Sequence, residues 1–582
     1  MIIIPGIWGI ISKKNIDLSN EFYKEEGTSY LIDHVFYQNA SLGRYVIDKF
    51  QNDKVFANVD QKTIGTDGIT LNLKNLLSKY KTKNYADLII NLYEKYDWKF
   101  VNKLRGNFSI FIYFDKENKL IVSTDHLASK PIYYFFDKES NTFIFSSNLR
   151  VVTRGMKHLG FTIDLDITGV YYLLTFGYML EDVTLIKNVK KLLPGHVIIY
   201  EDEKIEIKKY YKLSNKPYIE GNEDDIIKEL DKRFSNAIRL EYEKDLEYGY
   251  LHIATLSGGL DSRTNIAYAK KLGFNNLTCF TFSESNYLDE KIAKKICSDN
   301  NIEFIFYALD NGNYLTKYID NIILSNDGLI LFDGSSHLYN CLKKISFQNY
   351  GLIHTGMIGD LIVGSYLKGK EHYKINKESF KRITHSNILF HKLHLDINNF
   401  DYESGELFAF YTKCVNAVFN GYRMIEQFTE FSSPFLYIDF LEYALRIHPK
   451  YRYEESIYFK WINKCIPEFS KYRWEKCGLR PIYPISIMKY SRMFRRLIGK
   501  TTFGEKYVSM NPMKYWWKKN TDLQKKINSI FNENIKNLKN YPDILKDVEY
   551  LFNKKDLLTN KTQAITIIKS VDILGLNENK KT

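Results

Sequence analysis

Six consecutive residues have the types and spacing expected of a phosphate-binding turn: Ser257, Gly258, Gly259, Leu260, Asp261 and Ser262. The two glycines lack a Cβ atom, so the backbone can turn tightly and approach a ligand closely. Free N–H groups at the start of a following helix favour an anion such as pyrophosphate. Ser257 and Ser262 add hydroxyl donors, and Asp261 could hold the Mg²⁺ that accompanies phosphates. The turn therefore predicts a phosphate site; the alternative is a glycine turn whose Asp and Ser cap a helix.

The segments around this turn alternate between strand and helix patterns. An amphipathic helix is expected over 226–240, and the turn itself lies between a strand over 250–256 and a helix that ends at Gly273. A strand, a helix and a strand then follow over 277–282, 289–299 and 302–309. Strands that alternate with helices of this length predict a parallel α/β sheet. From about residue 380 the pattern is mostly helical.

The first 210 residues have the pattern of paired strands instead. Apolar, β-branched and aromatic runs over 107–114 and 119–123 are joined by a polar turn, and residues 133–136 and 142–146 form a similar pair. These hairpins, with a helix over 86–96 and a short strand over 197–200, predict an antiparallel α+β domain. The polar stretch 210–225, in which nothing demands burial, is the expected boundary. We therefore predict domains over 1–210 and 220–485 and a basic helical extension over 486–582.

Composition excludes several classes of protein. Of 582 residues, 45% are hydrophobic and 26% charged, which is too apolar for a disordered chain. No run reaches the ~18 apolar residues of a membrane span, and the apolar start, residues 1–11, is expected to be a buried strand rather than a signal peptide. The six cysteines, none before Cys279, form no disulfide pattern, so we expect a cytoplasmic protein. The net charge of +13 does not demand nucleic acid.

Further motifs occur in an order that matches a known family. They are LRGNF (104–108), DH (125–126), PIYY (131–134), LPGH (193–196), FTF (280–282), DE (289–290), TGMIGD (355–360) and the stretch 434–447. Together with the 257–262 turn, they resemble the asparagine synthetase family over about residues 1–480. Its members join an N-terminal class II glutamine amidotransferase domain to a PP-loop ATP pyrophosphatase domain.

The resemblance implies a fold, a reaction and roles for individual residues. The fold would be an Ntn-hydrolase-like antiparallel domain followed by a parallel-sheet domain of the PP-loop, or adenine nucleotide alpha hydrolase-like, type. ATP would activate a carboxylate as its AMP ester, pyrophosphate would leave, and an amine would attack to give an amide. Asp261 and Asp360 would share Mg²⁺. The adenine and the rest of the nucleotide would be bordered by Leu256, Phe282, Thr355 and Gly356.

One departure from the family lies in the amidotransferase domain. The family opens with Cys-Gly-Ile, in which the cysteine thiolate attacks glutamine. The equivalent residues here are Pro5, Gly6 and Ile7, and no cysteine occurs through residue 278. We therefore expect no glutamine hydrolysis. The chain is similar in this respect to the cysteine-less branch of the family, which includes β-lactam synthetases and lasso-peptide cyclases.

Two more departures concern the second domain. Met357 stands where the family has an acidic residue or a tyrosine that serves the amine, so the general base is not identified. For the lysine that steadies the departing pyrophosphate, the family spacing leads to Glu455; Lys460 is the nearest candidate and Lys476 the second. Arg263, directly after the turn, could contact phosphate, although a solvent-facing helix position is favoured.

These observations predict an AMP-forming carbon–nitrogen ligase of the asparagine synthetase type, with ATP and Mg²⁺ as cofactors. Its substrates would be a small-molecule or peptide carboxylate and an amine, either ammonia or a substrate amine, as in an intramolecular cyclase. The competing hypothesis is a nucleotide-binding pseudoenzyme or scaffold. A homodimer is possible; nucleic acid and integral membrane association are not expected. The basic stretch 488–500 is expected to be a surface helix on the second domain or, as an alternative, a contact for an anionic membrane or partner.

Overall fold

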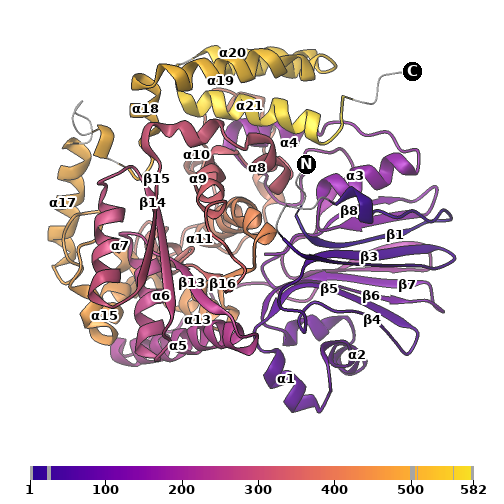
Figure 1. The fold of residues 1–582 in the computed structure, drawn as a ribbon, viewed down its shortest axis with the longest axis horizontal. Coiled ribbons are helices and arrows are strands. Elements are labelled where there is room, and N and C mark those ends of the chain that lie inside the picture. The colour runs from indigo at the N-terminus through magenta and orange to yellow at the C-terminus, as the bar shows by residue number, and fades with distance from the viewer. Residues whose placement is uncertain (1–3, 23–27, 499–504, 508, 555, 578–582) are drawn as a thin grey trace.

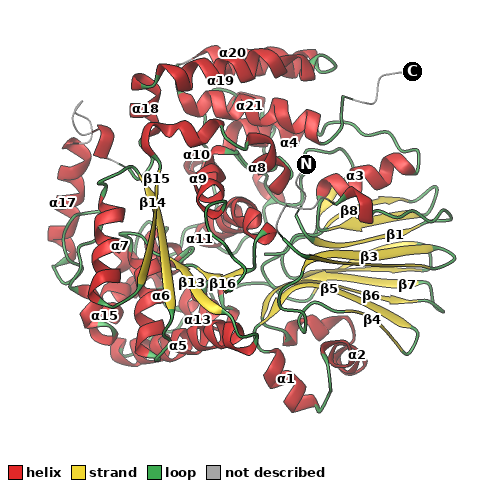
Figure 2. Cartoon of the chain, viewed as in Figure 1, coloured by secondary structure: helices red, strands yellow, loops and turns green. Residues whose placement is uncertain are grey.

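The computed structural model describes residues 4–22, 28–498, 505–507, 509–554 and 556–577. Its N-terminal part contains two stacked antiparallel sheets of six strands each (Figures 1 and 2). In order across the first sheet lie β10 (Lys190–Lys191), β8 (Tyr133–Asp137), β9 (Thr142–Ser146), β1 (Gly6–Ile11), β3 (Ala40–Ile47) and β2 (Tyr30–Phe36). In order across the second lie β12 (Lys204–Lys209), β11 (His196–Glu201), β7 (Lys119–Thr124), β6 (Gly106–Phe114), β5 (Lys62–Thr70) and β4 (Phe56–Val59).

Helices cover the outer faces of these sheets, so the domain has four layers. Helices α1 (Leu73–Tyr80) and α2 (Tyr85–Tyr96) share a hydrophobic cluster with the second sheet. Helix α3 (Leu149–His158) packs on β8 and β9 of the first sheet, and α4 (Ile167–Phe176) follows it. Between the sheets, Ile7, Leu42, Phe111 and Val122 form an apolar layer. Both predicted hairpins are present, β6 with β7 and β8 with β9.

The predicted strand at the chain start is also present, as β1, in which every residue is buried. Residues 1–3 of that prediction lie outside the described residues.

The second part is built on a sheet whose five strands are all parallel. Their order is β15 (Glu303–Ala308), β14 (Leu277–Ser283), β13 (Leu251–Thr255), β16 (Tyr350–His354) and β17 (Phe431–Ser432). The helices of this part are α5 (Glu223–Glu247), α6 (Leu260–Lys271), α7 (Leu288–Asp299), α8 (Ile319–Ser325), α9 (Asp333–Leu342), α10 (Lys377–Ile383), α11 (Gly405–Ala409), α12 (Phe419–Tyr422), α13 (Ile438–Arg446), α14 (Pro449–Arg452), α15 (Ser456–Cys465) and α16 (Pro467–Ser470). The predicted α/β class is confirmed.

The C-terminal helices are α17 (Ile485–Ile498), α18 (Met513–Lys519), α19 (Thr521–Asn534), α20 (Pro542–Lys554) and α21 (Leu558–Ile573). Helices α18 to α21 gather above α4 and α8, and α17 lies apart from them at the outer edge of the molecule (Figure 1). Helix α21 packs against both α4 and α8, and Gln563 donates to the Leu174 carbonyl. The C-terminal helices thus connect the two parts of the chain.

The stretch 210–225 differs from its prediction, because several of its residues are buried. Leu213 and Asn215 are 1% and 0% exposed, and the Asn215 amide donates to Glu406 Oε2 and to the Leu445 carbonyl. A polar sequence can satisfy such burial through hydrogen bonds, and both partners of Asn215 belong to the second part of the chain. Polarity alone therefore misled the prediction here.

A buried ion cluster lies where the two parts meet. Lys130 Nζ is 3.2 Å from Asp67, 3.5 Å from Glu426 and 2.9 Å from Glu430, and Lys54 Nζ is 2.7 Å from Glu430. Burial alone would raise the pKa of Glu430, but the charges of Lys130 and Lys54 lower it to about 2. Breaking such a cluster leaves an unpaired buried charge, so these residues hold the two parts in one arrangement.

Candidate active site

The turn at residues 257–262, predicted to bind phosphate, lies at the point where the strand order of the parallel sheet reverses. Residues 257–262 follow β13 and open α6, and residues 355–360 follow the neighbouring strand β16. The chain proceeds from β13 outward to β14 and β15 and then returns to the other side of β13 as β16. Ligands of open α/β sheets bind at the carboxyl ends of the strands at this kind of reversal. The topology thus brings together the two motifs that are about 100 residues apart in sequence.

The two loops interlock, and glycine is required where they touch. A Cβ atom on Gly356 would lie 2.2 Å from the Ser262 backbone nitrogen, and one on Gly359 would lie 2.6 Å from Asp261 Cγ. The Asn265 amide on α6 donates to the Thr355 carbonyl at 2.9 Å. Between the glycines, Ile358 has φ +68°, a strained conformation for a β-branched residue. The loops therefore approach each other closely, and the backbone strain at Ile358 is the energetic cost of this arrangement.

Hydrogen bonds fix the shape of the turn and leave a helix end open. The Ser257 N–H donates to Ser262 Oγ at 3.0 Å, and the Gly259 N–H donates to Ser257 Oγ at 3.1 Å. The Gly258 N–H donates to Asp289 Oδ1 at 2.6 Å, and burial raises the pKa of Asp289 to about 6. No side chain caps the N-terminus of α6. Its first N–H groups and the positive end of its dipole are thus available to a phosphate.

Two carboxylates meet across the interlocked loops. The Asp360 N–H donates to Asp261 Oδ2 at 2.9 Å, and the Tyr458 hydroxyl donates to Asp261 Oδ1 at 2.9 Å. Burial and the nearby charge of Asp360 hold the pKa of Asp261 well above its usual range. A divalent cation would relieve this repulsion, and carboxylate oxygens are the ligands that Mg²⁺ prefers. Asp261 and Asp360 therefore have the chemistry and proximity to hold Mg²⁺ together.

The structure brings Lys476, and not Lys460, to this carboxylate pair. Lys476 Nζ donates to Asp360 Oδ2 at 3.2 Å and lies 4.0 Å from Glu455 Oε1. Burial alone would lower the pKa of Lys476, but Asp360 and Glu455 outweigh it and raise the pKa. Lys460 is half exposed and instead forms an ion pair with Glu223 in the first turn of α5.

The outward direction of Lys460 follows from the period of helix α15. Tyr458, which contacts Asp261, and Lys460 lie two residues apart, or roughly 200° around a helix. If Tyr458 points into the site, Lys460 must therefore point away from it. Tyr458 was not singled out from the sequence. The helical period shows that Tyr458 and Lys460 cannot both point into the site, but it does not show which of them does.

Arg263 also differs from expectation, because it neither faces solvent nor points toward the phosphate turn as a free cation. It is 2% exposed and donates to the carbonyls of Gly258, Tyr472 and Arg473. These bonds tie the phosphate turn to the segment that carries Lys476 at its far end. The Arg263 guanidinium thus holds the 257–262 turn and the 472–473 segment in a fixed relative position.

The remaining predicted residues lie at or near the same edge of the sheet. Leu256 is buried, and its N–H donates to the Phe280 carbonyl; Phe282 lies at the end of β14 with its ring 4.8 Å from that of His337. The Thr355 hydroxyl donates to the Ser432 carbonyl at 2.9 Å.

Met357 is only 7% exposed and belongs to the main hydrophobic cluster. Its side chain is a core contact rather than part of the polar site.

A cavity of about 900 Å³ adjoins the carboxylate pair at Lys476. Glu455 and Glu475 line it near Lys476, and further along it is lined by Leu367, Phe459, Ile485, Met488, Arg492, Arg495 and Arg496. One oxygen of Glu475 is shielded from solvent without a hydrogen-bond donor, and burial together with Asp289 raises the pKa of Glu475 to about 7. Asp289 and Glu475 are site residues that the sequence analysis did not assign. The DE pair at 289–290 was the signal for Asp289, and Glu475 belonged to no motif in the sequence.

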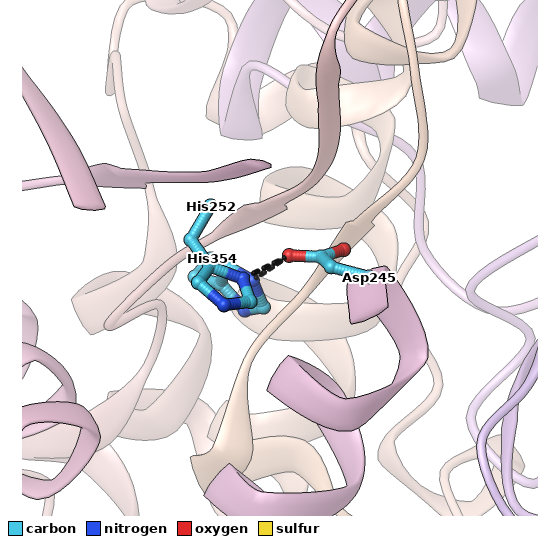
Figure 3. Close-up of side chains that lie close together, drawn as sticks. All are labelled: Asp245, His252 and His354. Carbon is cyan, nitrogen blue, oxygen red and sulfur yellow. Dashed lines mark hydrogen bonds and ion pairs between the residues drawn. The ribbon is translucent and has the colours of Figure 1, made fainter. Parts of the chain in front are cut away.

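A buried histidine–carboxylate network supports the second loop from behind (Figure 3). His252 Nδ1 on β13 and His354 Nε2 at the end of β16 lie 2.8 and 2.7 Å from the same oxygen of Asp245 on α5. These are hydrogen-bond distances, and on its other side the His354 ring lies 3.7 Å from Glu241 Oε2. Because Thr355 follows His354 directly, the network fixes the strand end from which the loop 355–360 departs.

The charge of His354 gives a prediction for stability. Burial opposes its protonation, but Asp245 and Glu241 raise the pKa of His354 from 6.5 to about 9. The folded protein thus holds this proton more tightly than the unfolded chain does. The stabilisation, on the order of 3 kcal/mol at most, is complete below pH 6.5 and is lost as the pH rises through 9.

We therefore expect the thermal midpoint to fall from pH 6.5 to 9, and to fall less steeply in His354→Gln. The measurement is a set of melting curves for both proteins in matched buffers over this range. Parallel curves for the two proteins would show that His354 does not carry the effect.

Pro5, which the sequence analysis placed at the position of the amidotransferase cysteine, directly precedes strand β1 of the first sheet. Pro5 is buried, the Ile4 carbonyl accepts a hydrogen bond from the Asn148 amide, and the Ile7 N–H donates to Ser147 Oγ at 3.1 Å. A Cβ atom on Gly6 would lie 2.3 Å from the Ser147 Cβ. Proline supplies no thiol, and all six cysteines of the chain follow residue 278.

No described helix is long and apolar enough to cross a membrane. Among the described residues, the one cluster of three or more His, Cys, Asp or Glu side chains close enough for a shared metal ion is the Asp245, His252 and His354 network.

Comparisons with known proteins agree with this architecture. A glutamine amidotransferase domain model matches residues 65–211, and an asparagine synthase model matches residues 229–417. A Methanocaldococcus jannaschii protein named as a glutamine-hydrolysing asparagine synthetase is 26% identical over 62% of this chain and 67% of its own length. Asparagine synthetase 1 of Bacillus subtilis is 24% identical over 52% of this chain. An amidase of Penicillium rubens is 25% identical over 47% of this chain.

The match spans 46% of the Bacillus relative and 41% of the Penicillium relative. The two family models occur in the expected order and together match more than half of the chain. They coincide with the antiparallel and parallel parts of the fold. The chain therefore belongs to the asparagine synthetase family.

Proposed function

We propose that this protein is an ATP-dependent, AMP-forming amide synthetase that does not hydrolyse glutamine. The observation that carries the proposal is the carboxylate pair at the phosphate turn: Asp261 and Asp360 are joined by a hydrogen bond between interlocked loops, with Lys476 beside them. Acidic side chains for a divalent cation, an open helix N-terminus and a cation for the leaving group are the parts that nucleotidyl transfer requires. Membership of the asparagine synthetase family supports the same reaction.

The residues divide the work of adenylation between them. The turn and the N-terminus of α6 would bind the phosphates, and Asp261 and Asp360 would hold Mg²⁺, which neutralises phosphate charge when bound. Leu256 and Phe282 would border the adenine. A carboxylate oxygen of the substrate attacks the α-phosphorus, the bond to the β-phosphate oxygen breaks, and pyrophosphate leaves. Lys476, whose pKa is raised by Asp360 and Glu455 against the effect of burial, would stay charged and stabilise the pyrophosphate.

In the second half-reaction an amine attacks the activated carbonyl and AMP leaves. The core position of Met357 supports the view that no acidic group at that place serves the amine. Because the first 278 residues hold no thiol to hydrolyse glutamine, the nitrogen would come from ammonia or from an amine already on the substrate, as in the cysteine-less branch of the family. An intramolecular cyclase acting on a peptide or a β-lactam precursor is the second candidate within this reaction class, and the buried Pro5 favours it equally.

The reaction is tested by phosphorus NMR of the nucleotide products. The protein is incubated with ATP, Mg²⁺, a panel of amino-acid and peptide carboxylates, and hydroxylamine as a general nucleophile that traps acyl-adenylates. We expect AMP and pyrophosphate in equal amounts, together with a hydroxamate, for at least one carboxylate. A protein that binds ATP but produces no AMP with any member of a broad panel would instead be the nucleotide-binding scaffold.

The amidotransferase domain gives a separate prediction. Because no thiol occurs in the first 278 residues, the purified protein should release no glutamate from glutamine. Diazo-oxo-norleucine, which alkylates glutaminase cysteines, should leave residues 1–210 unlabelled. Mass spectrometry of tryptic peptides and a coupled glutamate assay check both points. Stoichiometric labelling within this region, or glutamate release above a heat-inactivated control, would contradict the prediction.

A further inference from the structure

Helix α17 carries an exposed apolar stripe that the catalytic proposal does not use. Ile487, Tyr490, Phe494 and Leu497 recur at intervals of three and four residues, which places them on one side of the helix. They are 48%, 70%, 63% and 55% exposed, and Met493 beside them is 56% exposed. Eight of the large hydrophobic side chains exposed on the described chain lie between residues 482 and 498. A concentration of this kind marks an interaction surface.

The opposite side of α17 packs against the synthetase part. The helix is therefore docked in place, and its apolar stripe is exposed on the outer side. Met488 is 1% exposed, and the Ser491 hydroxyl donates to the Cys477 carbonyl at 2.7 Å. Arg492 stacks 4.2 Å over the Trp474 ring and donates to Glu455. Residues on this inner side also line the cavity next to Lys476. The helix is therefore anchored in one orientation, with its apolar stripe turned outward.

Charge distinguishes the possible occupants of this surface. Helix α17 contains Lys489, Arg492, Arg495 and Arg496 and no acidic residue. A second copy of the helix would bring an equal set of positive charges against these, which opposes self-association. A bilayer that contains anionic lipids offers both an apolar layer for the stripe and negative headgroups for Lys489 and Arg496, the two basic residues of α17 that are exposed. Tyr490 is of the aromatic type that favours the headgroup boundary, and Phe494 is typical of the apolar face of an interfacial helix.

The position of the helix suits a flat partner. Figure 1 shows α17 at the outer edge of the molecule, on the side opposite the N-terminal sheets and separate from the α18–α21 group. At 14 residues it is too short to span a bilayer but long enough to lie in the interface, at about 1.5 Å per residue. We propose that the stripe Ile487, Tyr490, Phe494 and Leu497 docks this protein peripherally on an anionic membrane surface.

The test is cosedimentation of the full chain with two kinds of unilamellar vesicle. One contains phosphatidylcholine alone, and the other contains phosphatidylcholine mixed with phosphatidylglycerol. We expect binding to the mixed vesicles that weakens as salt is added, and much weaker binding to phosphatidylcholine. The triple variant Ile487→Ser, Phe494→Ser, Leu497→Ser should bind the mixed vesicles at least about tenfold less, because the apolar part of the contact is removed.

A matched control replaces three exposed apolar residues on the other part of the molecule: Ile32→Ser, Phe36→Ser and Ile207→Ser. This variant should bind the vesicles like the wild type, and both variants should melt at the wild-type temperature. Three outcomes would overturn the proposal: no sedimentation with mixed vesicles, equal loss of binding in the control variant, or a wild-type dimer in light scattering that the α17 variant converts to monomer. The last would assign the stripe to a second copy of the chain.

Discussion

Asp261→Asn is expected to lower AMP formation by at least about 10³-fold while the protein stays folded. Asparagine keeps the volume of aspartate, and its single side-chain oxygen can still accept the Asp360 N–H while its amide group donates to the Tyr458 hydroxyl oxygen. What it removes is a charged oxygen ligand for Mg²⁺. Because burial and Asp360 already raise the pKa of Asp261, removing its charge should leave stability unchanged or slightly higher. The measurement combines product analysis of ATP turnover with melting curves.

The matched control is Asp320→Ala, which removes an exposed carboxylate that pairs with Lys569 far from the turn. It should turn over ATP like the wild type. Asp360→Asn should resemble Asp261→Asn, and the double variant should be little worse than either, since the two carboxylates would act as one unit. AMP release at the wild-type rate in Asp261→Asn would remove the metal assignment, even if the phosphate turn still bound nucleotide.

Lys476→Met should reduce the rate of adenylation by about 10²–10³-fold, whereas Lys460→Met should stay within about twofold of the wild type. The reason is placement: Lys476 reaches the carboxylate pair, and Lys460 pairs with Glu223 at the surface. ATP–pyrophosphate exchange with an accepted carboxylate separates the two lysines, because exchange depends on the pyrophosphate step in both directions. Methionine keeps the length of the lysine stem, so packing changes are small.

The reverse ranking, with Lys460→Met impaired and Lys476→Met active, would contradict the site as described. Equal impairment of both variants would point to a loss of folding, which melting curves would reveal.

Arg263→Met offers a related comparison: it leaves both lysines in place but removes the bonds to the Gly258, Tyr472 and Arg473 carbonyls. Its effect on exchange should exceed that of Lys460→Met, because it loosens the segment that carries Lys476.

The local elements could be predicted from the sequence because their signals are local. The hairpin of β6 and β7 follows from two alternating apolar runs with a polar turn, and the phosphate turn follows from two glycines between a strand and a helix. The order of the five parallel strands could not be read in this way. It is set by long-range packing, which also decides that residues 355–360 lie against Asp261.

The residues whose positions differ from the sequence predictions differ for a common physical reason. Choosing Lys460 over Lys476 relied on counting residues along the chain, but the chain bends back after α16 and brings Lys476 to Asp360 through space. Arg263 was expected at a solvent-facing helix position, yet it is buried and donates to three backbone carbonyls. The polar stretch 210–225 was expected to be exposed, and Asn215 is buried by similar bonds. Local sequence patterns fail to predict the burial and contacts of polar residues whose hydrogen-bond partners lie far along the sequence.

The central claim is that the carboxylate pair supports transfer of AMP to a carboxylate. The most direct measurement uses a carboxylate accepted in the panel and labelled with ¹⁸O in both oxygens, followed by mass spectrometry of the nucleotide product. If the carboxylate attacks the α-phosphorus, one labelled oxygen passes to AMP when the amine displaces it, and the Asp261→Asn protein forms no labelled AMP. Unlabelled AMP, or ADP and phosphate in its place, would contradict the account.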